Sequence, residues 1–321
     1  MGETQKALRI TEKMLRRGDS VEGISELTDL LPEKVAELIN HVCMLFVQHR
    51  GDREMDNRKL KSEIVYYINT LDDYKLPKEY KYSASIILSG STGWGIKEGK
   101  DSRADWDLHI IMTDHDYEEF VQFKGEDYII DDQDHTPVVF IQFHNIKWLY
   151  ERLEGNVPNS WPLYLWIYTN CVFVQDPVGV CNIVKSYKNK FDEELPELIK
   201  QYHITFSARR LDTCSSALRE LKVAAGINRA EMVKAALQTL CLISNEPFVY
   251  NKWLSKEVEL LYKDNADVSL ILDTCDRCLY ETDLKQLVQY SKILRDQIED
   301  QLFKKFGDKR WIHYWWEFNK N

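Results

Sequence analysis

The chain has 321 residues, of which 44% are hydrophobic and 29% charged, and its formal net charge is −10. The composition is that of a folded protein rather than a disordered one, and the length suits two or three domains. The negative charge excludes a global electrostatic attraction to nucleic acid, which is not an expected partner. No signal-peptide layout and no apolar run of roughly 20 residues is present, so we expect a cytoplasmic protein without a membrane segment.

Residues 1–50 have the periodicity of short helices and form a predicted N-terminal unit. The stretch RRGDSVEGISELTDLLPEKV, residues 16–35, resembles the helix-turn-helix unit of many bacterial proteins. In that arrangement the second helix would contact DNA, but here it carries Glu33, Lys34 and Glu37, which suit phosphates poorly. The charge pattern favours docking, either on a protein partner or by self-association.

Residues 51–181 alternate between helical and strand patterns, which predicts an α+β domain with a mixed sheet. A helix is expected over 60–71 and another in YEEFVQF. Strands are expected over 84–88 and 106–112, on both sides of the acidic turn at 131–134, and before the turn Asp176-Pro177. Residues 182–321 have helical periodicity almost throughout, with Gly226 and Gly307 as helix stops. This part is a predicted helical C-terminal domain.

The cysteines and the C-terminal aromatic residues each allow two interpretations. Cys275 and Cys278 have the spacing of a metal-binding pair, but no second pair matches them, so buried reduced thiols are expected. The final stretch RWIHYWWEF either stacks on a ligand ring or covers the core of the helical domain, and covering the core is the more common role of such a stretch.

The stretch from Ile87 to Met112 contains the pattern that predicts chemistry. Gly90-Ser91 directly follows a strand, where backbone N–H groups and a hydroxyl could contact a phosphate. Asp105 and Asp107 lie at the start of the next strand, and strand alternation places both on one face. Two carboxylates on one face repel each other unless a cation lies between them, and Mg²⁺ accepts such ligands beside substrate phosphates. The pattern therefore predicts a metal–triphosphate site.

This order of Gly-Ser, loop and Asp-x-Asp resembles the signature of the DNA polymerase β-like nucleotidyltransferase superfamily. Two further stretches, VFVQDPVG at 172–179 and NEPFVYNKWL at 245–254, are similar to segments of its small-molecule (antibiotic) branch. The resemblance implies that Asp105 and Asp107 are catalytic metal ligands for Mg²⁺ and that Gly90 and Ser91 bind an NTP, with ATP as the expected one. Lys252 would project onto the triphosphate or, alternatively, make an aromatic-lined contact between domains.

The resemblance also implies a third carboxylate on a neighbouring strand, and the sequence departs from this. In TPVVFIQFHN, residues 136–145, Gln142 stands at the expected position. His144 on the same face could remove the acceptor's proton, although a histidine at a strand end more often makes ordinary hydrogen bonds. Asp131, Asp132 and Asp134 could also supply an acid, or could form a solvated turn.

Three functions remain open from the sequence. The first is Mg²⁺-dependent transfer of a nucleotidyl group, expected to be AMP, to a hydroxyl of a small-molecule acceptor. The resemblance suggests an aminoglycoside- or lincosamide-like antibiotic, and hence a role in antibiotic resistance. The second is a non-catalytic nucleotide-binding regulator, which the missing third carboxylate would suit. The third is nucleotidylation of a protein or RNA partner.

Overall fold

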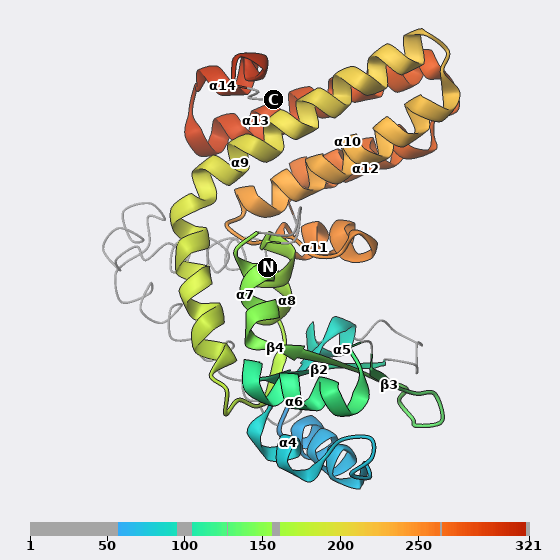
Figure 1. Cartoon of the computed structure of the whole chain (residues 1–321). Coiled ribbons are helices and arrows are strands. Elements are labelled where there is room, and N and C mark those ends of the chain that lie inside the picture. The colour runs from blue at the N-terminus through green and yellow to red at the C-terminus, as the bar shows by residue number, and fades with distance from the viewer. Residues whose placement is uncertain (1–56, 95–104, 127, 156–160, 264, 319–321) are drawn as a thin grey trace, which may run out of the picture. The chain divides into compact units, whose positions relative to one another are not determined.

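The computed structural model describes residues 57–94, 105–126, 128–155, 161–263 and 265–318. The predicted unit over 1–50 lies outside these residues. The chain divides into two compact units, 1–74 and 75–321. In the first unit a helix spans 57–70, close to the one expected at 60–71. The fold of the second unit is α+β, as predicted: a mixed sheet is followed by long helices (Figure 1).

The sheet has five strands in the order β3-β4-β2-β1-β5. Their bounds are β1 Ser85–Ser89, β2 Trp106–Met112, β3 Ile129–Asp132, β4 Val139–Asn145 and β5 Val172–Gln175. β2 and β4 are parallel, and the other neighbouring pairs are antiparallel. The expected strands are thus all present, each with bounds close to the prediction.

The two faces of the sheet are covered by different helices. Ile87 and Ile111 belong to one hydrophobic core with the helices that follow the sheet. The opposite face packs against α4 (Lys78–Ser83) and α6 (Asp114–Lys124): Phe120 of α6 lies 4.7 Å from Phe143 of β4 between ring centroids. Because the side chains of a strand alternate between its faces, Asp107, four positions before Ile111 on the central strand β2, faces the same helical side as Ile111.

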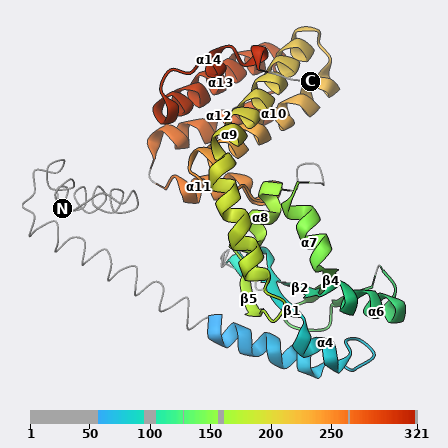
Figure 2. The same cartoon turned by 60° about the vertical axis from the view of Figure 1, so that its left-hand side comes forward.

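The remaining helices form the helical part of the second unit (Figures 1 and 2). After β1 comes the short helix α5 (Gly90–Trp94), and α7 (Ile146–Leu153) and α8 (Trp161–Thr169) precede β5. The helices that follow β5 are α9 Val180–Leu218, α10 Lys222–Ile243, the 3₁₀ turn η1 Asn251–Trp253, α11 Leu254–Leu261, α12 Ala266–Tyr280, α13 Leu284–Phe306, α14 Arg310–His313 and the 3₁₀ turn η2 Trp315–Glu317.

The 39-residue helix α9 begins beside β5 and runs on into the helical bundle (Figure 2). Its start is held by Asp176, whose Oδ1 accepts hydrogen bonds from Ser85 Oγ (2.6 Å) and Val180 N (2.8 Å). A carboxylate that accepts several N–H groups at a helix start also complements the helix dipole. The turn Asp176-Pro177 therefore joins the sheet to α9 rigidly, and the predicted boundary at 181/182 falls just inside this helix.

Gly226 does not stop a helix, contrary to the prediction. It lies within α10, and the break comes earlier, after Leu218. There Glu220 has φ 58°, its N–H bonds the carbonyl of Ala217 (3.0 Å), and Leu221 N–H bonds that of Ser216 (2.9 Å). This is a Schellman termination, which usually has glycine at the left-handed position. Because glutamate and not glycine occupies this position, the sequence does not indicate that the helix ends here.

For the cysteine pair and for the C-terminal aromatic stretch, the structure shows the more common of the two interpretations. Cys275 and Cys278 are buried thiols on α12. Trp315 is buried, while the carbonyl of Ile312 accepts a hydrogen bond from His203 Nε2 on α9 (2.9 Å). The aromatic end thus covers the helical core. Across the described residues, no helix is both long enough and apolar enough to cross a membrane.

Candidate functional site

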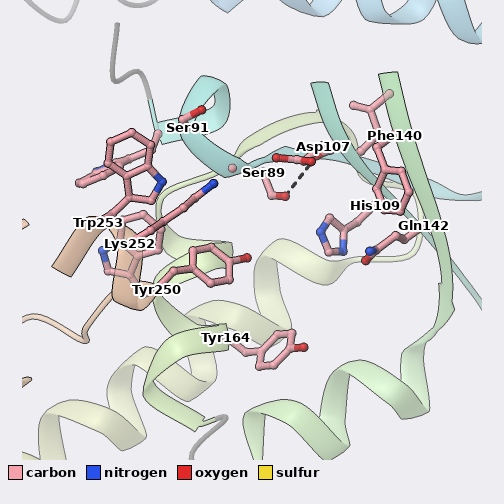
Figure 3. A pocket seen from close by; sticks show the side chains of 14 residues that line it. Ser89, Ser91, Asp107, His109, Phe140, Gln142, Tyr164, Tyr250, Lys252 and Trp253 are labelled. Carbon is pink, nitrogen blue, oxygen red and sulfur yellow. Dashed lines mark hydrogen bonds between the residues drawn. The ribbon is translucent and has the colours of Figure 1, made fainter. Parts of the chain in front are cut away.

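A cavity of about 410 Å³ lies between the sheet and the segment that precedes α11 (Figure 3). Its size falls within the usual range for small-molecule sites. The residues that line it come from β1, α5, β2, β4, α8 and η1 with the residue before it: Ser89, Gly90, Ser91, Trp94, Asp107, Leu108, His109, Phe140, Gln142, Tyr164, Trp166, Tyr250, Lys252 and Trp253. The structure therefore brings four of the predicted site residues to one cavity: Gly90, Ser91, Asp107 and Lys252.

Gly90 occupies a position that only glycine fits. Its φ is +68°, and a Cβ atom added there would collide with Oδ2 of Asp107 and lie 3.1 Å from its Cγ. A left-handed backbone already disfavours other residues. The carboxylate of Asp107 and the backbone after β1 are therefore in direct contact, which joins the two halves of the sequence motif.

Hydrogen bonds hold the loop after β1 against β2. Ser89 pairs with Asp107 across the two strands, and its hydroxyl donates to the Asp107 carbonyl (3.1 Å). The Thr92 hydroxyl donates to the Asp105 carbonyl (2.9 Å). The hydroxyls of Ser89 and Thr92 thus donate to backbone carbonyls, and Ser91 lies between them and also lines the cavity.

The Asp107 carboxyl is in an environment that disfavours its charge. Burial raises the pKa of Asp107, the charge of Asp105 raises it further, and Lys252 lowers it. Asp105 itself is exposed at the start of β2. A divalent cation next to both carboxylates would remove this penalty, so the pair fits one Mg²⁺. Among the described residues, no group of three or more His, Cys, Asp or Glu side chains is placed to hold a metal ion.

Lys252 reaches the cavity from the helical part of the unit, on η1. Its ammonium group extends toward Ser89 and Asp107 (Figure 3) and lies 5.6 Å from the ring centroid of Trp253. Trp94 packs edge-on against both Trp253 (6.3 Å) and Trp166 (4.8 Å). The ammonium group of Lys252 therefore lies beside a wall of tryptophan rings. An aromatic-lined contact and a contact with a triphosphate are both compatible with this position of Lys252.

Among the described residues, those that line the other side of the cavity are uncharged. In the register of β2 and β4, Phe140 lies beside Asp107, and Gln142 lies beside His109. His109 Nδ1 is 3.3 Å from the hydroxyl of Tyr168, and burial lowers the pKa of His109 to about 4. The imidazole is therefore neutral at pH 7, and Figure 3 shows it grouped with Phe140 and Gln142, across Asp107 from Lys252.

His144 is not among the residues that line the cavity. In the register of β2 and β4, His144 pairs with Ile111, whereas Gln142 pairs with His109. His144 is therefore farther along the strands from Asp107 than Gln142 is. Its ring stacks on Trp148 with 3.7 Å between centroids, and burial lowers its pKa to about 3. The geometry thus gives His144 a packing role in the sheet–helix layer and does not support its use as the acceptor's base.

Sequence reasoning missed His109 and the aromatic wall. The signal for His109 was present, because the alternation that puts Asp105 and Asp107 on one face continues to position 109. Tyr164 and Trp94 had no such signal, since their place depends on tertiary packing. Of the other candidates, Asp131 and Asp132 are part of β3 at the far edge of the sheet.

No model of a protein family matches the sequence, and no curated protein matches it. Among solved structures, the chain is similar to a nucleotidyltransferase-like protein from Exiguobacterium sibiricum 255-15. The two share 14% sequence identity with a TM-score of 0.41, over 79% of this chain and 77% of the other.

Proposed function

We propose that the cavity binds an NTP with Mg²⁺ and that the protein is a nucleotidyltransferase acting on a hydroxyl of a small molecule. One observation carries the proposal: Ser91, Asp107 and Lys252, which are far apart in the sequence, line one cavity. They supply a hydroxyl, a carboxylate and a cation, which are the groups that a metal–triphosphate complex requires. ATP is the expected NTP.

Each residue has a distinct role in the proposed reaction. Ser91 and the backbone at Gly90 bind phosphate oxygens, Lys252 offsets their charge, and Asp105 and Asp107 would hold Mg²⁺. When bound, the ion would orient the triphosphate and offset the charge that develops on it. The acceptor oxygen forms a bond to the α-phosphorus, the bond to the leaving pyrophosphate breaks, and the hydroxyl proton goes to solvent or a nearby acceptor.

The uncharged side of the cavity is the proposed acceptor side. Asp107 is the one carboxylate among the described residues that line the cavity, and it is assigned to the metal. Phe140, Gln142 and neutral His109 offer an aromatic face and hydrogen bonds but no negative charge. A hydroxyl-bearing acceptor with little positive charge, such as a lincosamide-like molecule, fits this side better than a polycationic aminoglycoside.

The test is to incubate the protein with Mg²⁺, each of the four α-labelled NTPs and acceptors of three kinds: aminoglycosides, lincosamides and neutral nucleosides or glycosides. Pyrophosphate release with label on a small acceptor, lost in Asp107→Asn, supports the proposal. Label on protein or RNA would instead indicate nucleotidylation of a macromolecule. A protein that binds no NTP would contradict the proposal altogether.

A second candidate is a regulator that binds NTP without turnover. It is favoured by the absence of a carboxylate at Phe140 and Gln142, the two β4 positions that line the cavity. Nucleotide binding that needs Asp107 and Lys252, with no pyrophosphate release across the whole acceptor set, would select this candidate.

A further inference from the structure

The strand β4 places no anionic ligand next to Asp107. Phe140 is its partner in the parallel pair, and paired residues of adjacent strands lie about 4.8 Å apart. The side chains of such a pair point to the same face, and both line the cavity. A benzene ring provides no oxygen, so a cation on this side of Asp107 would lose hydration without gaining a ligand.

The next position on β4 is also neutral. Gln142 pairs with His109 and lines the cavity, and its amide oxygen lacks the charge that Mg²⁺ or Mn²⁺ prefers. His109 is held at Nδ1 by the Tyr168 hydroxyl (3.3 Å). Two dications about 4 Å apart repel each other strongly, and the sites that hold such pairs share carboxylates between them. Among the described residues that line the cavity, Asp107 is the one carboxylate, and Asp105 lies two positions before it.

The opposite side of the cavity already holds a fixed positive charge. Lys252 lines the same cavity as Asp107, and its ammonium group extends toward that carboxylate (Figure 3). An ammonium group at this place offsets phosphate charge without requiring protein carboxylates. The charge that a second metal ion would supply is therefore available from the chain itself.

We propose that the site holds a single divalent cation, the one bound by Asp105 and Asp107 with the NTP, and that Gln142 is the residue that excludes a second. This inference rests on the proposed function, because it presumes that the cavity binds a metal–triphosphate complex. It concerns the number of cations and the residue that sets this number.

The experiment counts Mn²⁺ ions bound to the full-length protein saturated with α,β-methylene-ATP. The electron paramagnetic resonance signal of unbound Mn²⁺ gives the number bound, and dipolar broadening reports two ions close together. The wild-type protein is expected to bind one Mn²⁺ per nucleotide, without broadening. Gln142→Glu is expected to bind two, with broadening, because it adds a carboxylate beside His109, in the same cavity as Asp107.

Two further variants serve as controls. Gln142→Met removes the amide without adding charge and should still bind one Mn²⁺. Gln201→Glu makes the same charge change at an exposed position on α9, outside the cavity, and should also bind one. A second ion in Gln201→Glu would show that net charge alone sets the count, against the proposal.

The outcomes separate this inference from the function on which it rests. Two Mn²⁺ in the wild-type complex would overturn the single-cation site while leaving NTP binding in place. One Mn²⁺ in Gln142→Glu, with the nucleotide bound, would overturn the assignment to Gln142. Failure of the wild-type protein to bind the analogue with Mn²⁺ would overturn the proposed function itself, and this inference with it.

Discussion

Oδ2 of Asp107 lies so close to Gly90 that the Cβ atom of any other residue at position 90 would collide with it. Gly90 directly follows the buried strand β1 and Asp107 is the second residue of β2, so the contact sets the position of the carboxylate relative to the segment that carries Ser91. The geometry of the site therefore depends on the lack of a side chain at Gly90 as much as on the side chains that line the cavity.

Gly90→Ala is expected to weaken binding of the Mn²⁺–nucleotide complex at least ~10-fold, because the added methyl group must displace the Asp107 carboxylate. Isothermal titration calorimetry with α,β-methylene-ATP measures this. Gly125→Ala is the matched control, since Gly125 has φ +91° with nothing within 4 Å of the added Cβ atom. Both variants carry backbone strain of about 1 kcal/mol, so equal affinity in the two would show that the contact with Asp107 is unimportant.

Asp107→Asn is expected to abolish cation-dependent nucleotide binding while leaving the thermal stability of the unliganded protein equal or higher. Burial and Asp105 both disfavour the charge of Asp107, and the amide removes that charge at nearly constant shape. Differential scanning fluorimetry with and without Mn²⁺ and nucleotide measures both effects. Asp105→Asn should weaken binding less, because Asp105 is exposed. A melting temperature well below that of the wild type would contradict this view of Asp107.

Lys252→Met is expected to lower affinity for ATP about 10-fold and affinity for AMP much less, because the ammonium group offsets the charge of the outer phosphates. Comparing the dissociation constants of ATP, ADP and AMP tests this. Lys256→Met serves as control, since Lys256 pairs with Glu259 (3.0 Å) on α11 and does not line the cavity. Equal losses for ATP and AMP would indicate a packing role for Lys252.

Trp166→Phe is expected to reduce the free energy of unfolding by about 2 kcal/mol. The indole Nε1 donates to Oε1 of Glu257 (3.2 Å), and both side chains are buried. Burial raises the pKa of Glu257. Loss of the indole donor would leave the buried Glu257 carboxyl without this hydrogen bond, which lowers the free energy of unfolding. Urea denaturation measures the change. The double variant Trp166→Phe/Glu257→Leu should be less destabilised than the sum of the two single variants, and simple additivity would contradict the coupling.

His203 should make stability fall as the solution becomes acidic. Burial lowers its pKa from 6.5 to about 4, so between these values the unfolded chain binds a proton that the folded chain does not. Its contribution is constant above pH 6.5 and is lost progressively down to pH 4. Over this window His203→Gln should flatten the pH dependence of unfolding by up to about 1.4 kcal/mol per pH unit. The exposed His115 gives the control His115→Gln, which should leave the slope unchanged.

The strands and the site motif could be predicted from sequence because their signals are local. β2 has the predicted bounds, and Asp107 and His109, two positions apart, both line the cavity as alternation requires. Gly90 was predicted to lie where a phosphate contacts the backbone, which stays a prediction, and the structure shows the Asp107 carboxylate close to it.

The parts that sequence did not reveal depend on contacts between distant segments. Gln142 was expected beside the aspartates, but the register pairs it with His109 and puts Phe140 next to Asp107. Alternation gives the face of a residue but not the register between two strands. The helix break at Glu220 was missed for a different reason, because a residue other than glycine took the left-handed conformation.

The sheet and the helices of residues 75–321 share one hydrophobic core, which includes Ile87 and Ile111 of the sheet and Phe191 and Phe206 of α9. Since α9 is continuous from β5 into the bundle, separating the two halves would expose the apolar faces of both. Neither half is therefore a portable module. A gene fusion or exchange that joined this sheet to a foreign helical domain would have to replace α9 as well, so the two halves are expected to be inherited together.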